Sequence, residues 1–406
     1  MAVVCICAGM LLSGCGKADK YYEQGVKQAQ EGNYVQAAQS MQKAISRNDE
    51  KAEYYISYGM ILNSLGEYDK ALAQYSKAYQ DTKNSIANTN NKQIYYGQAM
   101  AYYNRAEYDK SLECLENAQK LPNPAEIDGD ILCLQGLVYE ARGEQDTALE
   151  AYSGAIKKDA KNWDAYLKRG ALEEKLGEND LAQKDYQMVI SGDTRKEGAE
   201  KFEAYFSLYS LCDALEEEDV KEQIVGQILK NDSKSAFIQA QKGRIYLCQK
   251  DYANAGKYLR AAQKAGYAQA GYYLGSLMMQ QNKIQEAEKY FQAFIKENGD
   301  PMLADAYNQL AGCAIQDKQY KKAAGYLEKG LQVPGASDRK TIWRNLIVVY
   351  EMQGEFKQAA GEAKEYLAVY PQDTAMKKEY RFIKTRITRK KTAAVAVTKS
   401  AVSVAE

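Results

Sequence analysis

A short pattern recurs along this chain roughly every 32 to 40 residues. GEYDKALAQYSKA at 66–78 is followed by AEYDKSLECLENA at 106–118. In the first copy Tyr68, Leu72 and Tyr75 stand at i, i+4 and i+7, which is one face of an α-helix. An amphipathic helix that returns at such an interval needs neighbouring copies to cover its apolar face. The pattern therefore predicts a stack of repeated units.

Ten units can be aligned on one anchor residue in the first helix of each unit. Four residues before the anchor an aromatic recurs, and nine after it a second aromatic recurs. Twelve after the anchor the residue is Ala in most units, with Ser111 also small and Lys221 the one clear exception. The anchors are Gly25, Gly59, Ala99, Gly136, Gly170, Tyr209, Gly243, Gly275, Ala311 and Ile347.

This pattern resembles the tetratricopeptide repeat, whose signature of aromatic, Leu-Gly, Tyr, Ala, aromatic and Pro extends over about 34 residues. The resemblance covers roughly residues 18–372. It implies an all-α fold, a right-handed α-solenoid (superhelix) of about ten helix-turn-helix repeats across 15–372, closed by a C-terminal capping helix. The unit at Tyr209 lacks both the small anchor and the Ala, so we expect it to be distorted or to mark a break between two stacks.

Three longer intervals place their extra residues in polar or Pro/Gly-rich stretches at 82–92, 121–130 and 191–200. We expect these stretches to form loops that decorate one rod. The chain has only five prolines and no alternating β-branched runs, so strands are not expected.

The first fourteen residues are uncharged, too few to span a bilayer, and typical of the apolar part of a secretory signal. Leu12, Ser13, Gly14 and Cys15 resemble a bacterial lipobox. The resemblance implies a lipoprotein signal peptide over 1–14 and a lipid-bearing Cys15 at the extracytoplasmic face of a cell membrane. The alternative is a buried apolar N-terminal segment.

The segment AMKKEYRFIKTRI at 375–387 carries an apolar stripe on one helical face. We therefore predict a basic capping helix over 373–391 that seals the last repeat, followed by a disordered tail at 392–406. A basic face can contact anionic lipid or nucleic acid. The favoured interpretation is a solvated cap with no nucleic acid partner, because the chain balances 54 basic against 54 acidic residues.

Chemistry is limited by the absence of histidine, which excludes histidine-based triads and histidine metal sites. The cysteines Cys114, Cys133, Cys212, Cys248 and Cys313 fall in different units, so neither a disulfide framework nor structural zinc is expected. We expect no cofactor, no metal and no enzymatic activity.

The candidate binding residues follow from the resemblance, because helix A lines the concave side of the superhelix in that family. The slots three before and four after the anchor hold aromatic side chains that suit an incoming peptide or a glycan ring. The alternative is that they complete the core between repeats. These residues are Tyr22, Tyr96, Tyr103, Phe206 and Tyr272.

Acidic residues recur six positions before the anchor. They form either a negative groove or, as we prefer, the favourable acidic first turn of each helix. The acidic positions are Asp19, Glu53, Asp130, Asp164, Glu203 and Asp305.

Together these features indicate a membrane-tethered, non-enzymatic scaffold that binds a segment of a partner protein in its concave groove. Two alternatives stay open. The first is a lipid-anchored binding protein for a small ligand or glycan. The second is a cytosolic co-chaperone or regulator.

Overall fold

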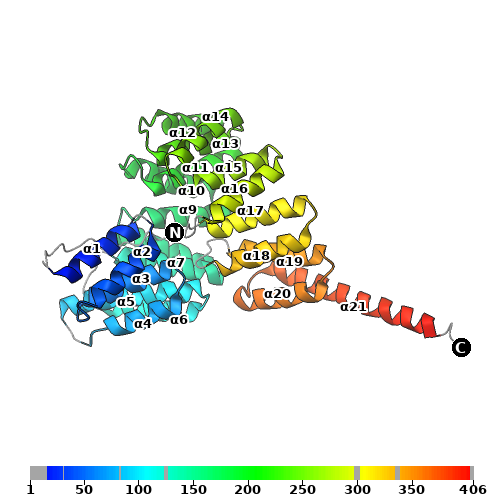
Figure 1. The fold of residues 1–406 in the computed structure, drawn as a ribbon, viewed down its shortest axis with the longest axis horizontal. Coiled ribbons are helices and arrows are strands. Elements are labelled where there is room, and N and C mark those ends of the chain that lie inside the picture. The colour runs from blue at the N-terminus through cyan, green and yellow to red at the C-terminus, as the bar shows by residue number, and fades with distance from the viewer. Residues whose placement is uncertain are drawn as a thin grey trace. The chain divides into compact units, whose positions relative to one another are not determined.

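The computed structural model describes residues 16–30, 32–81, 84–122, 127–296, 302–333 and 339–402. Within these ranges the chain forms twenty-one α-helices and no β-strand (Figure 1). The predicted all-α repeat fold is therefore confirmed.

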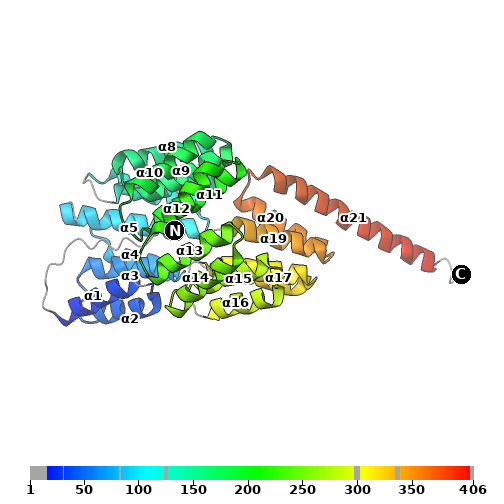
Figure 2. The same cartoon turned by 90° about the horizontal axis from the view of Figure 1, so that it is seen from above.

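Each odd-numbered helix from α1 to α19 is a first helix A, and the even-numbered helix after it is a second helix B. Within the units nine A helices pack antiparallel against the following B helix, and successive pairs of one unit lie side by side (Figure 2). Every sequence anchor falls inside a helix A. The nine pairs are α1 (Lys17–Gln30) with α2 (Tyr34–Ile45), α3 (Ala52–Ser64) with α4 (Tyr68–Ala78), α5 (Ser85–Asn104) with α6 (Tyr108–Lys120), α7 (Asp128–Arg142) with α8 (Gln145–Lys158), α9 (Trp163–Leu176) with α10 (Asn179–Gly192), α11 (Ala199–Ala214) with α12 (Glu218–Lys230), α13 (Ala236–Cys248) with α14 (Tyr252–Lys264), α17 (Leu303–Gln316) with α18 (Tyr320–Gln332), and α19 (Arg339–Met352) with α20 (Phe356–Val369). The A helix α15 (Ala270–Gln280) and the B helix α16 (Ile284–Lys296) lie between the seventh and eighth of these pairs along the chain.

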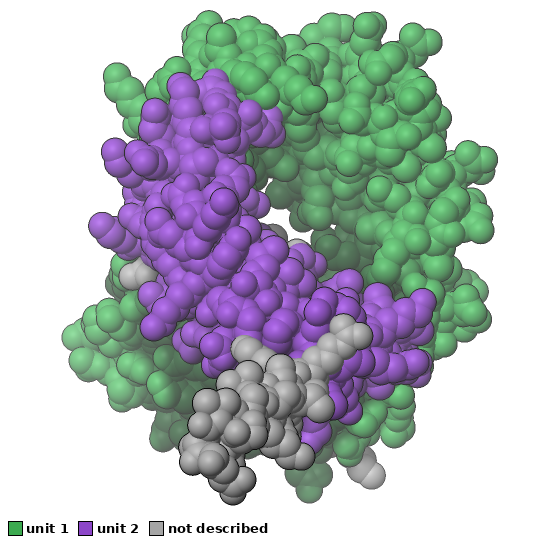
Figure 3. Space-filling model, turned by 90° about the vertical axis from the view of Figure 1, so that its right-hand side faces the viewer, with its two compact units in different colours: residues 1–277, 297–300 green, residues 278–296, 301–406 purple. Residues whose placement is uncertain are grey.

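The chain divides into two compact units, coloured separately in Figure 3. Unit 1 comprises residues 1–277 and 297–300, and unit 2 comprises 278–296 and 301–406. The division falls within α15. The expected break at the Tyr209 unit is therefore not where the chain divides.

Close approach of the two helices in a pair explains the small anchor. A Cβ added to Gly59 on α3 would lie 2.5 Å from the ring of Tyr75 on α4, and one added to Gly243 would lie 2.6 Å from Leu259. Both partners stand sixteen residues after their anchor. Since real side chains do not approach so closely, the small anchor and the bulky residue sixteen positions later form one packing unit.

In three pairs the residue at that sixteenth position is a buried tyrosine whose hydroxyl meets the side chain four residues after the anchor. These contacts are Asn63 Nδ2 to the Tyr75 hydroxyl (3.1 Å), the Tyr152 hydroxyl to Glu140 (3.3 Å) and the Tyr186 hydroxyl to Glu174 (2.9 Å). Burial raises the pKa of all three phenols. A buried hydroxyl needs a partner, so the polar side chain at the fourth position lets tyrosine stand at this point of the core.

The α11–α12 pair replaces the small anchor and the alanine by Tyr209 and Lys221. The Lys221 ammonium lies over the Tyr209 ring, 5.5 Å from its centroid. Its Nζ also donates to Asp213 (2.5 Å) and Glu218 (2.9 Å). A cation–π contact thus stands where most other pairs use two small residues.

The predicted loop at 82–92 is a helix from Ser85 onward. Asn84 caps α5 by accepting a hydrogen bond from the Ala87 backbone N–H (2.8 Å). Asn91 then exchanges two hydrogen bonds with the backbone of Gln80, at 2.8 and 3.2 Å, which fixes the extra turns to the end of α4. The extra residues therefore lengthen helix A.

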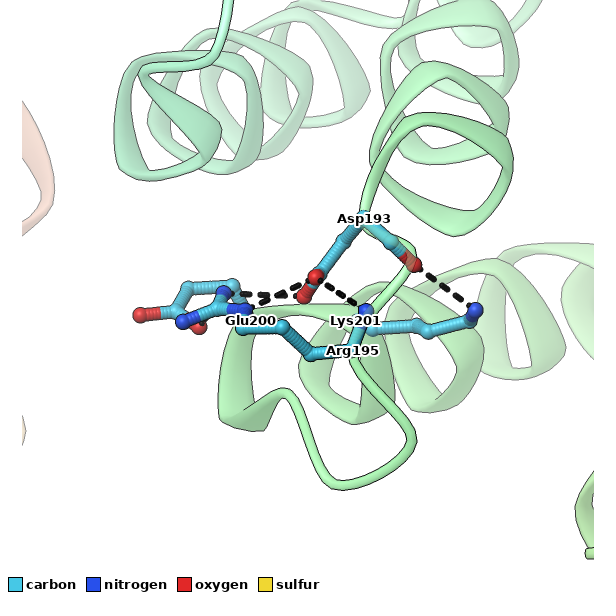
Figure 4. A network of polar contacts seen from close by, with 4 residues as sticks. All are labelled: Asp193, Arg195, Glu200 and Lys201. Atoms are coloured by element: carbon cyan, nitrogen blue, oxygen red, sulfur yellow. Dashed lines mark hydrogen bonds and ion pairs between the residues drawn. The ribbon is translucent and has the colours of Figure 1, made fainter.

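The predicted loop at 191–200 does connect α10 to α11, and a polar network closes it (Figure 4). Asp193 accepts from Arg195 Nε (2.8 Å), and its carbonyl accepts from Lys201 (2.8 Å). Arg195 also donates to Glu200 (2.6 Å). Although burial opposes ionisation, the bonds from Arg195 hold the pKa of Asp193 below its usual value. The loop is therefore held by charge-assisted bonds.

The last helix, α21 (Thr374–Val402), packs against α20 in unit 2. Met376 is 3% exposed and Ile383 is fully buried. Asp373 precedes the helix and accepts from the Met376 backbone N–H (2.9 Å) and the Tyr366 hydroxyl (2.6 Å). The helix continues to Val402, past the end at 391 that the sequence suggested. The segment after 391 is rich in Ala, which favours helix.

Candidate protein-binding site

The predicted site residues lie on A helices, and all five are partly buried. Tyr22 on α1 stacks on Tyr54 of α3 with ring centroids 5.0 Å apart, and its hydroxyl shares a hydrogen bond with Ser57 (3.3 Å). Tyr22 thus links the first two repeats.

Tyr96 and Tyr103, both on α5, pack against the apolar cluster shared by α5, α6 and α7. The ring of Tyr103 also lies 6.1 Å from that of Tyr108 at the start of α6. Part of each side chain is therefore used in packing between repeats, and part remains accessible.

Phe206 contacts Arg244, a residue that the sequence analysis did not single out, and Tyr272 is linked to Arg244 through Tyr273. The Arg244 guanidinium on α13 lies over the Phe206 ring of α11, 3.8 Å from its centroid. The same guanidinium lies 4.8 Å from the centroid of the Tyr273 ring on α15. Tyr272 and Tyr273 meet edge to face at 5.5 Å. We call this set, Phe206, Arg244, Tyr272 and Tyr273, the Arg244 ladder. It joins three successive A helices of unit 1.

One hydrogen bond orients the guanidinium. Arg244 Nη1 donates to Gln241 Oε1 at 2.8 Å, and Gln241 is 1% exposed, so the acceptor is fixed in the core. Among the described residues no carboxylate forms an ion pair with Arg244. The ladder therefore holds a positive charge in place without neutralising it.

Arg244 follows its anchor, Gly243, by one position. Arg244 therefore falls outside the slots three before and four after the anchor, which hold the predicted binding residues. The only sequence signal is its place between aromatic residues on the preceding and following A helices, which is visible only once the repeats are stacked.

The acidic positions mostly serve the repeats. Asp19 accepts from Lys51 and from the Tyr54 hydroxyl, each at 2.5 Å, and the Lys51 bond in particular lowers its pKa. Asp130 accepts from Asn162 at 3.1 Å. Burial, together with the charge of Asp164, raises the pKa of Asp130 to about 6. These contacts favour the structural interpretation of the acidic positions.

Other kinds of site were sought in the part of the chain that the structure describes. It contains no group of three or more Cys, Asp or Glu side chains placed to hold a metal ion. Nor does any helix in that part combine the length and apolar character that crossing a membrane requires. The lipobox residues Leu12, Ser13, Gly14 and Cys15 lie outside the described residues.

A family model described as "Tetratricopeptide repeat" matches residues 22–86, 96–162, 133–194 and 272–338, more than half of the chain. The chain belongs to the tetratricopeptide repeat family. Members of this family bind other proteins. The matched ranges leave out 195–271, the stretch with the unusual tetratricopeptide unit at Tyr209.

Curated relatives match a shorter stretch of this tetratricopeptide repeat protein. Photosystem I assembly protein Ycf3 of Prochlorococcus marinus is 31% identical over 84 residues, which is 21% of this chain and 49% of the relative. Protein bimA of Emericella nidulans is 30% identical over 87 residues, 21% of this chain and 10% of the relative. The chain thus spans about half the length of the Ycf3 relatives it matches, and much less of bimA.

Solved structures of similar proteins include a tetratricopeptide repeat protein from Parabacteroides merdae. It is 19% identical, and the match covers 64% of this chain and 98% of that one with a TM-score of 0.40. MamA from Desulfovibrio magneticus is 18% identical, over 44% of this chain and 96% of that one, with a TM-score of 0.33.

Proposed function

We propose that this chain is a non-enzymatic scaffold that holds a segment of a partner protein against the A helices of unit 1. The observation that carries the proposal is the Arg244 ladder. Arginine and aromatic side chains supply most hot spots at protein interfaces. Here the arginine is already oriented by Gln241 and by the rings of Phe206 and Tyr273, so binding costs little additional side-chain entropy.

The same geometry indicates what the partner segment carries. A guanidinium presents its N–H groups as a planar fork that fits a carboxylate through two parallel hydrogen bonds. The Arg244 ladder therefore suits a segment with an acidic side chain or a free C-terminus, flanked by residues that pack on Tyr272. The photosystem I assembly proteins among the relatives support the general role of holding proteins together.

Peptides selected from a displayed random library on the full chain test this proposal. Arg244→Ala should weaken the selected peptides by roughly thirtyfold or more, the usual effect of truncating a hot spot. The matched control is Arg260→Ala, an exposed arginine on the B helix α14, which should leave affinity unchanged. Equal affinity of Arg244→Ala and the parent chain would contradict the proposal. Binding of oligosaccharides in place of any peptide would instead favour a glycan-binding protein.

We further propose that Cys15 carries a lipid that tethers the scaffold to the extracytoplasmic face of a bacterial membrane. The support is the sequence Leu12-Ser13-Gly14-Cys15 after an uncharged stretch. Labelled fatty acid should enter the protein in a bacterial host, and Cys15→Ala should abolish that label. The control Cys114→Ala should keep it. Label that survives Cys15→Ala would reject the tether and leave the peptide-binding proposal standing.

A further inference from the structure

The side of α21 that faces away from the last repeat is rich in positive charge. Met376 and Ile383 are buried against the last repeat, which turns the opposite side of the helix to solvent. Glu379 is the one acidic residue between Ala375 and Thr388. The exposed cations on this side are Lys378, Arg381, Lys384 and Arg386. Capping the last repeat thus leaves the basic face uncovered.

Three large apolar side chains are also exposed on α19 and α21. Phe382 on α21 is 45% exposed, and Val348 and Met352 on α19 are 43% and 49% exposed. These are the exposed large hydrophobic residues among the described part of unit 2.

Contacts between α19 and α21 place the two sets together. The charge of Glu379 on α21 acts on the Glu351 carboxyl of α19, so these two side chains lie close together. Val348 and Met352 lie within one turn of Glu351, and Phe382 lies one turn after Glu379. The Arg386 guanidinium lies over the Phe382 ring, 4.9 Å from its centroid. The helix α19, which carries Val348 and Met352, therefore lies next to the basic helix α21.

Glu351 and Glu379 together reduce the positive charge beside α21 by less than two units. Burial, and then the neighbouring Glu379, raise the pKa of Glu351 to about 7, while Arg386 acts in the opposite direction. Because a neighbouring carboxylate disfavours a second negative charge, these two carboxyls retain part of a proton near neutral pH.

We propose that the α21 face, meaning Lys378, Arg381, Lys384, Arg386, Phe382, Val348 and Met352, binds the surface of a membrane rich in anionic phospholipid. Cations beside apolar side chains are the combination that an interfacial helix uses, with the charges at the headgroups and the apolar groups at the acyl boundary. Duplex nucleic acid offers phosphates but no apolar layer for Val348 and Met352. The inference is independent of peptide binding by the Arg244 ladder.

The test uses the full chain with Cys15→Ala, so that no attached lipid contributes. Binding is measured by sedimentation with phosphatidylcholine vesicles, with and without about one-third phosphatidylglycerol. The readout is the ratio of the two partition coefficients, in which contributions that do not depend on lipid charge cancel. We expect a ratio far above one that falls as salt is added.

Two charge-reversed variants are compared. Lys378→Glu, Arg381→Glu and Lys384→Glu together should lower the ratio by at least roughly a hundredfold, because each cation near an anionic surface contributes roughly a fivefold effect. The matched control reverses three exposed cations on another helix, Lys257→Glu, Arg260→Glu and Lys264→Glu on α14, and should keep the ratio. Phe382→Ser with Met352→Ser should weaken binding to the anionic vesicles about tenfold. Circular dichroism melting confirms that each variant is folded.

Three results would overturn the proposal. They are a ratio near one for the parent chain, equal losses in the α21 and α14 variants, or an unchanged ratio in the folded α21 variant. Binding of duplex DNA that depends on α21, combined with a ratio near one, would replace the lipid by nucleic acid.

Discussion

Glu173 on α9 is 7% exposed, and its Oε2 is buried without a hydrogen-bond partner among the described residues. Its nearest cation is Arg169, with Nε 3.7 Å away. Arg169 is engaged by Asp185 through two bonds of 2.7 Å. Burial, and then the charge of Asp185, raise the pKa of Glu173 from 4.5 to about 7. The carboxyl is thus poorly compensated when it ionises.

A stability change with pH follows. Between pH 4.5 and 7 the folded state keeps the Glu173 proton while the unfolded state loses it, so the free energy of unfolding falls as pH rises through this range. Glu173→Gln removes the charge and keeps the shape. We expect it to raise the free energy of unfolding by about 2 kcal/mol at pH 8 and to change little near pH 4.

Chemical denaturation at the two pH values checks this prediction. Glu150→Gln, on the exposed side of α8, is the control and should behave like the parent chain at both. An equal effect of Glu173→Gln at pH 4 and pH 8 would show that Glu173 does not carry the pH dependence.

At the residue scale the sequence located Phe206 and Tyr272 but not Arg244, whose guanidinium lies over the rings of Phe206 and Tyr273. Phe206, Arg244 and Tyr273 stand on three different helices, and their contact depends on side-chain positions that repeat spacing does not encode. Whether Tyr22, Tyr96 and Tyr103 also bind a partner stays a prediction. Their packing against neighbouring repeats shows that an aromatic in an inward slot can also serve the core.

Among the B helices, α12 buries the fewest residues. It buries two residues, Ile224 and Ile228, whereas α10 in the preceding repeat buries four. Its contact with α11 includes the Tyr209–Lys221 pair in place of the small anchor and alanine that pack most other pairs closely. In a repeat array each unit is stabilised by its own core and by its neighbours, so a weak helix opens locally.

We therefore expect amide hydrogen exchange to be faster in α12 than in α8 and α10. The difference should persist in the presence of any peptide selected on the Arg244 ladder, because α12 is a B helix. Protection of α12 equal to that of α10 would contradict the assignment of this unit as the weakest of unit 1.

Helix positions followed well from the sequence, because the spacing of anchor, tyrosine and alanine reflects the contact between A and B helices. The N-terminal turns of α5 did not. Asn-rich segments usually favour turns, and here Asn84 and Asn91 instead cap and fasten a longer helix. The tertiary partners of those two side chains decide the outcome.

For the molecule as a whole, equal numbers of basic and acidic residues leave no net field to attract a partner. Recognition must then come from local faces. Unit 1 holds an oriented arginine between aromatic rings, and unit 2 presents the α21 face. We propose that the Arg244 ladder binds the protein partner and that the α21 face binds the membrane surface.

Site-specific photo-crosslinking in cells tests the central claim most directly. A benzophenone amino acid replaces Tyr272 in the Arg244 ladder or, as the control, Met188, which is 46% exposed on the B helix α10. The account predicts a discrete protein adduct from position 272 that disappears when Arg244→Ala is added, and no such adduct from position 188. An adduct of equal yield from position 188, or one from position 272 that survives Arg244→Ala, would contradict the claim that this ladder holds the partner.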